Sequence, residues 1–352
     1  MVRVGVVGLR RGWSLLRTFA AFPAADVAAA CDTDSALLER AGRELGVPAL
    51  YTRYEELLAH PLDVVVVASP LPLHAAHSIA ALQCDRHVLS EVPAVASLEE
   101  GRALAAAARR SRGRYMLAEN CCWWAFIEAW REMVAAGRIG KVVYAEAEYV
   151  HDCRRLMRDA AGQPTWRAAM PPIQYCTHSL GPLLWITGDR CLTTCGAHTG
   201  CNVAPELGAI DMEVAVCRTQ SGGVFKILCG FSVVREPAFH YYTLYGTRGC
   251  LERARGEDKT FGYFADDPNA AGMVSLPLSY VHPNAPAGAT VGGHGTCEYY
   301  MVAAFLQSLR EGREPPIGVD LALDMTLPGI CAHLSAEQGG KPVEVPNPRD
   351  WS

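Results

Sequence analysis

The sequence lacks any long apolar run. No stretch of about 18 consecutive apolar residues occurs in the 352-residue chain, so we expect no membrane-spanning helix and no membrane partner. The chain starts directly with a strand-like segment at residues 3–7, which leaves no room for an export signal before it. These absences together predict a cytoplasmic protein.

An excess of positive charge is also missing. The 32 Lys and Arg residues are outnumbered by 37 Asp and Glu residues, and the formal net charge is −5. Because faces that bind DNA or RNA are strongly basic, we expect no nucleic-acid partner. Half of the residues are hydrophobic and 20% are charged, as in ordinary globular proteins, and the length suffices for two domains.

The 14 cysteines lack the regular spacing of a disulfide framework. One cluster, Cys191-x3-Cys195-x2-His198-x2-Cys201, has ligand-like spacing but matches no standard zinc pattern. Cysteine also packs as a small hydrophobic side chain in strands and turns. We therefore expect no metal, and this cluster is the alternative that stays open.

A glycine turn follows the first predicted strand. Residues 3–7 are apolar and end at Gly8, and a helical pattern covers residues 14–22. The pyrophosphate of a dinucleotide lies at such a turn, against the helix N-terminus. A full G-x-G-x-x-G fingerprint would need two further glycines, but Arg10 and Trp13 stand there. We expect the cofactor to contact the turn residues Gly8, Arg10, Arg11, Gly12 and Trp13.

An acidic residue ends the second predicted strand. Asp32 follows the strand at 26–31 and lies 24 residues after Gly8. A carboxylate at this distance holds the adenosine ribose hydroxyls and repels the 2′-phosphate of NADP, so the sequence favours NAD as cofactor. The alternative is that Asp32 only caps the helix that starts near Asp34.

Polar residues follow the later strands of the same region. Strands at 63–68, 87–89 and 115–118 alternate with Ala-rich helices, which predicts a doubly wound parallel sheet. Ligands of such sheets bind at the carboxyl ends of the strands. We therefore predict a Rossmann domain over residues 1–120 whose NAD site also includes Ser69, Pro70, His74, Glu91, Pro93, Glu119 and Asn120.

The second part of the chain has a different pattern. Residues 121–137 predict one long helix, and several strands then follow without intervening helices, at 142–149, 192–197, 212–219, 223–234 and 241–245. We therefore predict the α/β class. The N-terminal Rossmann domain is followed by a C-terminal α/β domain, residues 121–352, with a large, open and mostly antiparallel sheet.

Two pairs of Tyr and His occur just after the first domain, Tyr149-x-His151 and Tyr175-x2-His178. Both side chains can transfer protons, and a nicotinamide needs such a partner when it takes hydride from an alcohol. The alternative is that buried Tyr and His residues only satisfy hydrogen bonds in the core. For the set of four we favour the catalytic interpretation.

Candidate substrate-binding residues surround these pairs. The segment 153–174 reads as a loop that covers the substrate, and its Arg154, Trp166 and Arg167 are the candidates within it. Arginine binds carboxylate or phosphate groups, although it is also often only solvated. His294 precedes a predicted helix, so it either reaches the substrate or caps that helix.

Several of these motifs together resemble the Gfo/Idh/MocA oxidoreductase family. The family implies an N-terminal dinucleotide domain and a C-terminal α/β domain whose open sheet often forms the oligomer interface. It also implies oxidation or reduction of a ring carbinol in sugars and cyclitols. From the resemblance we expect a small-molecule sugar or glycoside as substrate and a homo-oligomer, a dimer or tetramer, formed through the C-terminal sheet. The motifs are the modified glycine turn, Cys31-Asp32, Ser69-Pro70-x3-His74, Glu91-x-Pro93 and Glu119-Asn120.

Two departures from this family are informative. Val92 replaces the lysine of the Glu-Lys-Pro motif, and the Asp-x3-His-x2-Asp motif reads Gln174-x3-His178-x2-Gly181, so the family's usual proton relay does not transfer. The substituted motifs resemble one branch, the NAD-dependent α-N-acetylgalactosaminidase family of glycoside hydrolases. They are Glu91-Val92-Pro93-Ala94, Met116 to Asn120, Tyr149-x-His151-Asp152, Tyr175 to Pro182, and Gly292-Gly293-His294-Gly295.

The sequence therefore predicts an NAD-dependent sugar oxidoreductase in which Tyr175 or His178 accepts the hydroxyl proton and Tyr149 and His151 complete the relay. A redox-neutral glycosidase, lyase or epimerase is the alternative. In that reaction a transient oxidation acidifies the neighbouring C–H bond and the retained NADH returns the hydride, without the paired carboxylates of ordinary glycosidases. A non-enzymatic dinucleotide-binding regulator is a third hypothesis, against which the Tyr and His pairs argue.

Overall fold

The computed structural model describes residues 1–268 and 271–351. The chain forms two compact units. The first contains residues 1–123, 281–323 and the C-terminal stretch from 348, and the second contains residues 124–280 and 324–347. The sequence predicted a single boundary near residue 120. It did not predict that residues 281–323 belong to the first unit.

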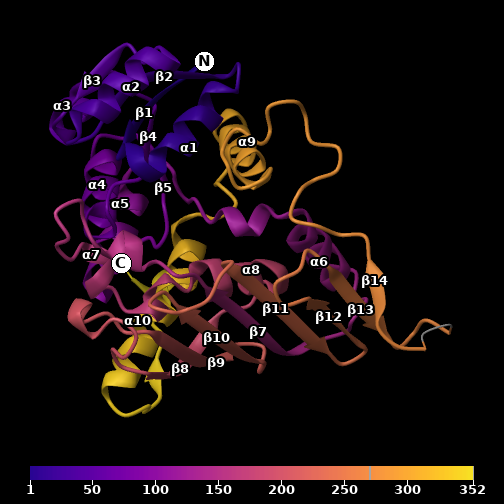
Figure 1. Ribbon diagram of the computed structural model, residues 1–352. Helices are drawn as coiled ribbons and strands as arrows, with labels where there is room; N and C mark the ends of the chain where they lie inside the picture. The colour runs from indigo at the N-terminus through magenta and orange to yellow at the C-terminus, as the bar shows by residue number, and fades with distance from the viewer. Residues whose placement is uncertain (269–270, 352) are drawn as a thin grey trace. The chain divides into compact units, whose positions relative to one another are not determined.

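The first unit is built on a six-stranded parallel sheet, in agreement with the predicted Rossmann domain (Figure 1). Its strand order is β3-β2-β1-β4-β5-β6, and every pairing is parallel. The central strand β4 consists of four consecutive valines, all fully buried, because helices cover both faces of such a sheet. The strands are β1 Val2–Val7, β2 Ala25–Cys31, β3 Ala49–Tyr51, β4 Val64–Val67, β5 His87–Ser90 and β6 Tyr115–Leu117.

Local capping signals set the ends of several helices in the first unit. Asp34 caps α2 by accepting the N–H of Ala36, and α2 ends at the left-handed Gly46. Ser97 caps α5 in the same way. The prediction for the first helix was wrong at its start, because α1 begins at Leu9 directly after Gly8 rather than near Ser14. The helices are α1 Leu9–Ala20, α2 Ser35–Leu45, α3 Tyr54–Ala59, α4 His74–Gln83 and α5 Leu98–Arg110.

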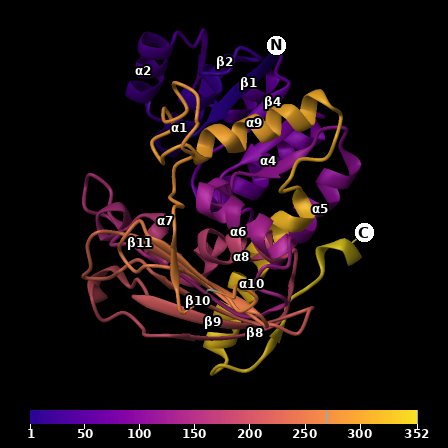
Figure 2. The same ribbon diagram turned by 90° about the vertical axis from the view of Figure 1, so that its right-hand side faces the viewer.

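Residues 281–323 complete the first unit late in the chain. Helix α9, Cys297–Arg310, lies alongside α1 (Figure 2), and the ring of Tyr299 stacks on Phe22 with centroids 4.6 Å apart. The N–H of Leu117 donates to the carbonyl of Ile317 at 3.0 Å, which ties this segment to the end of β6. Side-chain stacking and backbone pairing therefore hold the returning segment in the first unit.

The second unit is built on a nine-stranded sheet with the order β14-β13-β12-β11-β7-β10-β9-β8-β15 (Figure 1). The β7–β10 pairing is parallel and the other pairings are antiparallel, which confirms the predicted mostly antiparallel sheet. The strands are β7 Val142–Val150, β8 Cys191–His198, β9 Met212–Thr219, β10 Val224–Gly230, β11 Phe239–Gly246, β12 Gly249–Arg253, β13 Thr260–Phe264, β14 Val274–Leu276 and β15 Val343–Glu344.

The helix expected over residues 121–137 is broken at Trp124, whose backbone is extended (φ −67°, ψ 137°). A short 3-10 turn, Asn120–Trp123, precedes the break, and α6, Ala125–Ala135, follows it. The first N–H groups of α6 donate to the carbonyls of Tyr280 and Ser279, so a distant segment satisfies them. Local periodicity cannot show such a partner, which is why the prediction failed here.

Further helices cover one face of the second sheet. Helix α8, Thr177–Thr187, contacts β7, where the small side chains of Ala145 and Ala147 are fully buried. A short helix α7, Trp166–Ala169, lies in the segment expected to be a loop, and α10, Val319–Glu337, contains residues of both units.

None of the helices in the described parts of the chain has the length and apolar character that a membrane span requires.

Candidate functional site

Gly8 shapes the turn at the end of β1. Its φ of +85° lies in the region that favours glycine, and a Cβ at this position would lie 2.4 Å from the carbonyl oxygen of Ala68. Helix α1 starts at the next residue; its N-cap residue, Gly8, has no side chain, its first turn contains no acidic residue, and Asp32 accepts the N–H of Leu9. Such a helix end favours an anion, so the turn fits the pyrophosphate of a dinucleotide.

Asp32 lies at the carboxyl end of β2 and is held by the backbone. One carboxylate oxygen accepts the N–H of Leu9 at 2.5 Å, and the other accepts the N–H of Asp34 at 2.9 Å. The cap of α2 is Asp34, so the capping alternative for Asp32 is wrong. The first N–H of α1 therefore fixes the carboxylate beside the glycine turn, where an acid can bind ribose hydroxyls.

Arg11 joins two buried carboxylates within the first unit. Its Nε lies 3.0 Å from Oε1 of Glu91, and its Nη1 lies 2.7 Å from Oε1 of Glu298, which is fully buried in α9. His294 binds the same Glu298 oxygen through Nδ1 at 2.8 Å. Burial acts to raise the pKa of Glu298, but the hydrogen bond from His294 and the charge of Arg11 outweigh it and lower this pKa to about 2.

This cluster changes the interpretation of two predicted residues. Arg11, expected at the cofactor, and His294, expected at the substrate or at a helix cap, meet on Glu298 just inside α9. Glu298 itself was not a candidate, because one glutamate in an amphipathic helix looks like an exposed residue. The capping-type spacing between His294 and Glu298 was its only sequence signal.

His74 links two strand ends of the nucleotide-binding sheet. Its Nε2 lies 2.7 Å from the carbonyl of Ser69, and its Nδ1 lies 2.8 Å from the carbonyl of Pro93. The ring is almost fully buried, so its role here is to hold the loops after β4 and β5 in place. Beside it, His77 lies 3.0 Å from the Ser69 hydroxyl, and burial, together with the charge of His74, lowers the pKa of His77 to about 4.

The other predicted cofactor residues have varied surroundings. Arg10 is exposed, whereas the ring of Trp13 is covered by the Arg40 guanidinium at 4.0 Å from the ring centroid. Glu119 and Asn120 are buried after β6, and Glu119 accepts the N–H of Cys121 at 3.2 Å. Gly12 and Pro70 lie in α1 and in the loop after β4.

The four predicted proton-transfer residues come together in the second unit. Tyr149 and His151 lie at the end of β7 with Oη and Nδ1 3.0 Å apart, and Tyr175 and His178 flank the start of α8. The ring of His178 lies 5.6 Å from that of Tyr149 and 5.3 Å from that of Tyr175, centroid to centroid. We call these four residues the Tyr–His cluster.

The electrostatics of the cluster keep His151 neutral. Burial lowers the pKa of His151, and the charge of Arg167 acts in the same direction, whereas Glu236 and Asp152 oppose them. A lowered pKa keeps the imidazole neutral near pH 7, so its ring nitrogen can take a proton.

Sequence reasoning missed the rings that surround the cluster. His240 on β11 stacks on Tyr149 with centroids 4.1 Å apart, and Phe231 meets the same ring at 5.1 Å. Tyr242, also on β11, donates from its hydroxyl to the carbonyl of His178. No motif marks these residues, because their placement follows from which strand pairs with β7.

The predicted substrate-binding residues of segment 153–174 are engaged locally. Arg154 forms two hydrogen bonds to Asp152, at 2.8 and 2.5 Å, which hold the pKa of that carboxyl below its usual range. The guanidinium of Arg167 lies over the ring of Trp166 at 4.4 Å. Arg154 is thus neutralised by a neighbour, while Arg167 adds positive charge near His151.

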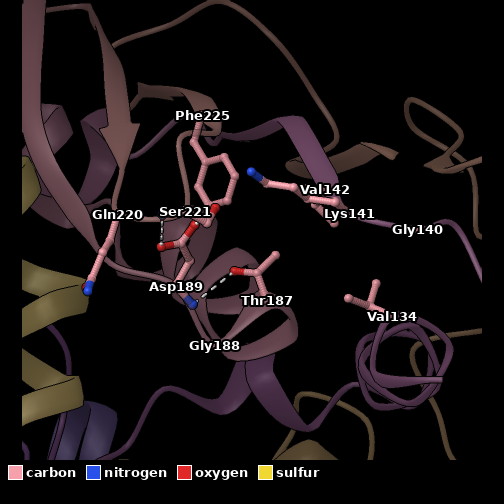
Figure 3. Close-up of a pocket in the computed structure, with 10 residues that line it drawn as sticks. All are labelled: Val134, Gly140, Lys141, Val142, Thr187, Gly188, Asp189, Gln220, Ser221 and Phe225. Carbon is pink, nitrogen blue, oxygen red and sulfur yellow. Dashed lines mark hydrogen bonds between the residues drawn. The ribbon is translucent and has the colours of Figure 1, made fainter. Parts of the chain in front are cut away.

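One pocket of the second unit lies away from the cluster and contains none of the predicted residues. A pocket of about 450 Å³ lies where β7 starts and α8 ends, and Asp189 in it is hydrogen-bonded by the hydroxyl of Ser221 at 2.5 Å (Figure 3). His178 and Tyr149 belong to the opposite ends of α8 and β7. Within residues 1–268 and 271–351, the Cys191–Cys201 candidates do not converge on one point as metal ligands would, and His198 instead pairs with Glu337.

The parallel sheet, the glycine turn and the acid after β2 define a dinucleotide-binding α/β protein. Residues 2–119 match the family model of the oxidoreductase family with the NAD-binding Rossmann fold, and residues 127–252 match the GFO/IDH/MocA C-terminal domain. The chain therefore belongs to the Gfo/Idh/MocA oxidoreductase family, an enzyme family whose cofactor here is NAD.

Several relatives are similar over nearly the whole chain. A glycosyl hydrolase family 109 protein of Streptomyces filamentosus is 29% identical over an alignment of 387 residues. The alignment covers 98% of this chain and 77% of that protein. An oxidoreductase domain protein from Kribbella flavida has the same fold, with a TM-score of 0.85, 22% identity, and 98% and 100% of the two chains covered. Levoglucosan dehydrogenase in complex with NADH and levoglucosan also has this fold, with a TM-score of 0.85 and 19% identity. The match covers 98% of this chain and 99% of that chain.

Replacement of Asp32 tests its place at the ribose. We expect Asp32→Ser to weaken NAD binding about tenfold or more, roughly 1.4 kcal/mol, and to reduce the preference for NAD over NADP, because the carboxylate is lost. Titration calorimetry with both nucleotides measures this. Asp34→Ser is the matched control, since serine also caps helices, and it should leave NAD affinity unchanged. Equal NAD affinity in wild type and Asp32→Ser would contradict the assignment.

The Glu298 carboxylate gives the first unit a pH-dependent stability. Its folded pKa of about 2 lies below the ordinary value of 4.5, so its contribution is complete above pH 4.5 and is lost as the pH falls towards 2. We expect Glu298→Gln to lower the free energy of unfolding at pH 7 by roughly 1–3 kcal/mol, and the difference from wild type to shrink below pH 4.5. Urea unfolding at a series of pH values measures it, with the exposed Glu99→Gln as control.

Proposed function

We propose that the protein is an NAD-dependent oxidoreductase that acts on a ring carbinol of a sugar, a glycoside or a sugar-containing metabolite. The observation that carries this proposal is the Tyr–His cluster. Four side chains able to move protons converge in a chain whose first unit has the NAD-binding Rossmann fold. A regulator that only bound a dinucleotide would have no need of such a group.

The chemistry divides between the cofactor and the side chains. Bound NAD supplies the hydride acceptor. In the oxidation, the hydrogen of the carbinol C–H bond leaves as a hydride, with both electrons of that bond. The proton of the O–H group goes to a base. The products are a ketone, NADH and the proton. Tyr175 or His178 accepts the hydroxyl proton, and the hydrogen-bonded Tyr149 and His151 carry it onward. The lowered pKa of His151 keeps its imidazole neutral, the state that can accept a proton, and disfavours retention of that proton.

The surroundings of the cluster support a sugar as substrate. Sugars present hydroxyl groups together with apolar C–H faces, and aromatic rings with polar tips bind both. Tyr149, Tyr175 and Phe231 supply rings here, and the histidines supply hydrogen-bonding groups. The names of levoglucosan dehydrogenase and of a scyllo-inositol dehydrogenase with the same fold support the same substrate class.

A redox-neutral glycosidase, lyase or epimerase is the second candidate, and similarity to glycosyl hydrolase family 109 proteins favours it. In that reaction oxidation of a ring carbon acidifies the adjacent C–H bond, and a base removes that proton. The glycosidic oxygen then leaves with a proton from a histidine, water adds, and the hydride returns. The net change is hydrolysis without consumption of NAD.

Variants in the cluster should separate chemistry from cofactor binding. We expect Tyr149→Phe and His178→Gln to lower kcat by roughly 10²–10⁴-fold, because each removes a proton carrier. NAD affinity should stay within about twofold, since these residues lie outside the Rossmann unit. His198→Gln, the same change at an exposed site, is the control for His178→Gln and should retain wild-type activity.

The assay first measures nucleotide released from denatured protein. It then follows NADH formation with a panel of sugars, and aglycone release from nitrophenyl glycosides without added NAD. NADH formed in proportion to ketone supports the oxidoreductase. Aglycone release with a retained nucleotide and no net NADH supports the second candidate instead, and a protein without either activity excludes both.

We also propose that the chain forms a homo-oligomer, a dimer or tetramer, through the face of the second sheet that α8 does not cover. On this face Glu146 pairs with Lys226 at 3.2 Å and Glu148 pairs with Arg255, so its charges are largely neutralised. On the same face, Val216 on β9 and Tyr245 on β11 are 43% and 44% exposed. Apolar side chains among neutralised charges suit a protein interface.

Val216→Asp should disrupt this oligomer, because it places an unpaired charge in the interface. We expect light scattering to give a dimer or tetramer mass for wild type and a monomer mass for the variant. Val203→Asp, at a residue that is 37% exposed outside the strands, is the control and should keep the wild-type mass. A monomeric wild type, or an unchanged Val216→Asp variant, would exclude this interface.

A further inference from the structure

Strand pairing places His240 directly opposite Tyr149. Strands β11 and β7 are antiparallel neighbours, and His240 and Tyr149 are partners in their register. Side chains of directly opposite residues point to the same face of a sheet, with their Cβ atoms about 4.5–5.5 Å apart. The imidazole of His240 is therefore carried to the phenol of Tyr149 by the sheet itself.

The two rings form a parallel stack. Their centroids are 4.1 Å apart and their planes are inclined by only 14°. Two other rings hold His240 from the side: Trp124 meets it edge-on at 4.9 Å with an inclination of 70°, and His178 meets it at 6.0 Å with 77°. His240 is thus fixed in its plane by neighbours on two other segments of the second unit.

Other residues contact the remaining sides of Tyr149. Its hydroxyl is hydrogen-bonded to Nδ1 of His151 at 3.0 Å, and Phe231 meets its ring at 5.1 Å with an inclination of 72°. The stack with His240 is the one broad, face-to-face contact among these. A swing of the side chain about its Cα–Cβ bond, which would carry the hydroxyl away from His151, would have to break this stack.

We infer that His240 is a positioning residue for Tyr149, which holds the phenol plane so that its hydroxyl stays aligned with His151 during proton transfer. The inference rests on the proposed function of the Tyr–His cluster and adds a member to it. Misplacement of a catalytic group by about 1 Å lowers rates by roughly 100-fold, so a stacking partner can matter as much as a direct participant. A flat ring is the property that this role requires.

The variants His240→Ala and His240→Phe separate the stack from the imidazole. We expect His240→Ala to lower kcat by roughly 10–100-fold with KM changed less than about threefold, because alignment fails while the substrate still binds. His240→Phe keeps a flat ring and should restore kcat to within about threefold of wild type. Unchanged NAD affinity and thermal unfolding midpoints verify that both variants are folded.

Two kinetic outcomes would overturn the inference. Equal losses in His240→Phe and His240→Ala would mean that the imidazole takes part in the chemistry itself. Wild-type kcat in His240→Ala would mean that the stack has no role. His198→Ala, an exposed histidine at the end of β8, is the control and should be silent.

A second measurement does not depend on turnover. In NMR spectra of protein with ring-labelled tyrosine, the Tyr149 signal is assigned by its loss in Tyr149→Phe. We expect ring-current shifts of this signal in wild type and in His240→Phe, and their disappearance in His240→Ala. If no sugar or glycoside is turned over, the proposed function fails, whereas the shifts still decide whether His240 positions Tyr149. A signal that is the same in all three proteins would refute the positioning role.

Discussion

The pairing of β7 with its two neighbours is the constraint on which the second unit depends. β7 is parallel to β10 on one side and antiparallel to β11 on the other, so residues 144–150 lie inside the sheet. Alternate residues then have fixed faces: Ala145, Ala147 and Tyr149 lie on the side of α8, and Glu146 and Glu148 lie on the other. A slip by one residue would exchange the two faces and would move Tyr149 away from the other residues of the Tyr–His cluster.

In the first unit, an arginine pairs with the glutamate beside the position where the family motif has lysine. Val92 is buried and cannot replace that lysine chemically. The neighbouring Glu91 is nevertheless paired with a cation, because Arg11 reaches it from the first turn of α1. Arg11 is thus balanced by two carboxylates, Glu91 and Glu298. The first turn of α1 and the altered Glu91-Val92-Pro93 motif are therefore linked through one ion pair.

Much of this arrangement could be predicted from the sequence, and the reason is periodicity. The apolar strands, the Ala-rich helices between them and the polar residues at strand ends were enough to predict a doubly wound parallel sheet. The Tyr and His pairs were visible because they repeat a motif. The rings of Tyr149 and Tyr175 lie 6.5 Å apart, centroid to centroid.

What the sequence did not reveal depends on distant partners. The start of α1 at Leu9 is stabilised by Asp32, and the break at Trp124 by Tyr280 and Ser279. The position of His240 beside Tyr149 depends on the register of β11 with β7, which the sequence does not show. Short strands such as β13 and β15 have too few residues for a recognisable pattern. Contacts between residues far apart in the chain are invisible to local propensity, whereas they decide these details.

The return of residues 281–323 to the first unit has a consequence for biosynthesis. A ribosome releases the chain from its N-terminus, so strands β1 to β6 emerge first, the whole nine-stranded sheet except β15 comes next, and α9 emerges only afterwards. Until Glu298 emerges, Arg11 lacks one of its two carboxylates, and Phe22 lacks the ring that covers it. The nucleotide-binding unit is therefore begun first during translation but finished after most of the second unit has been made.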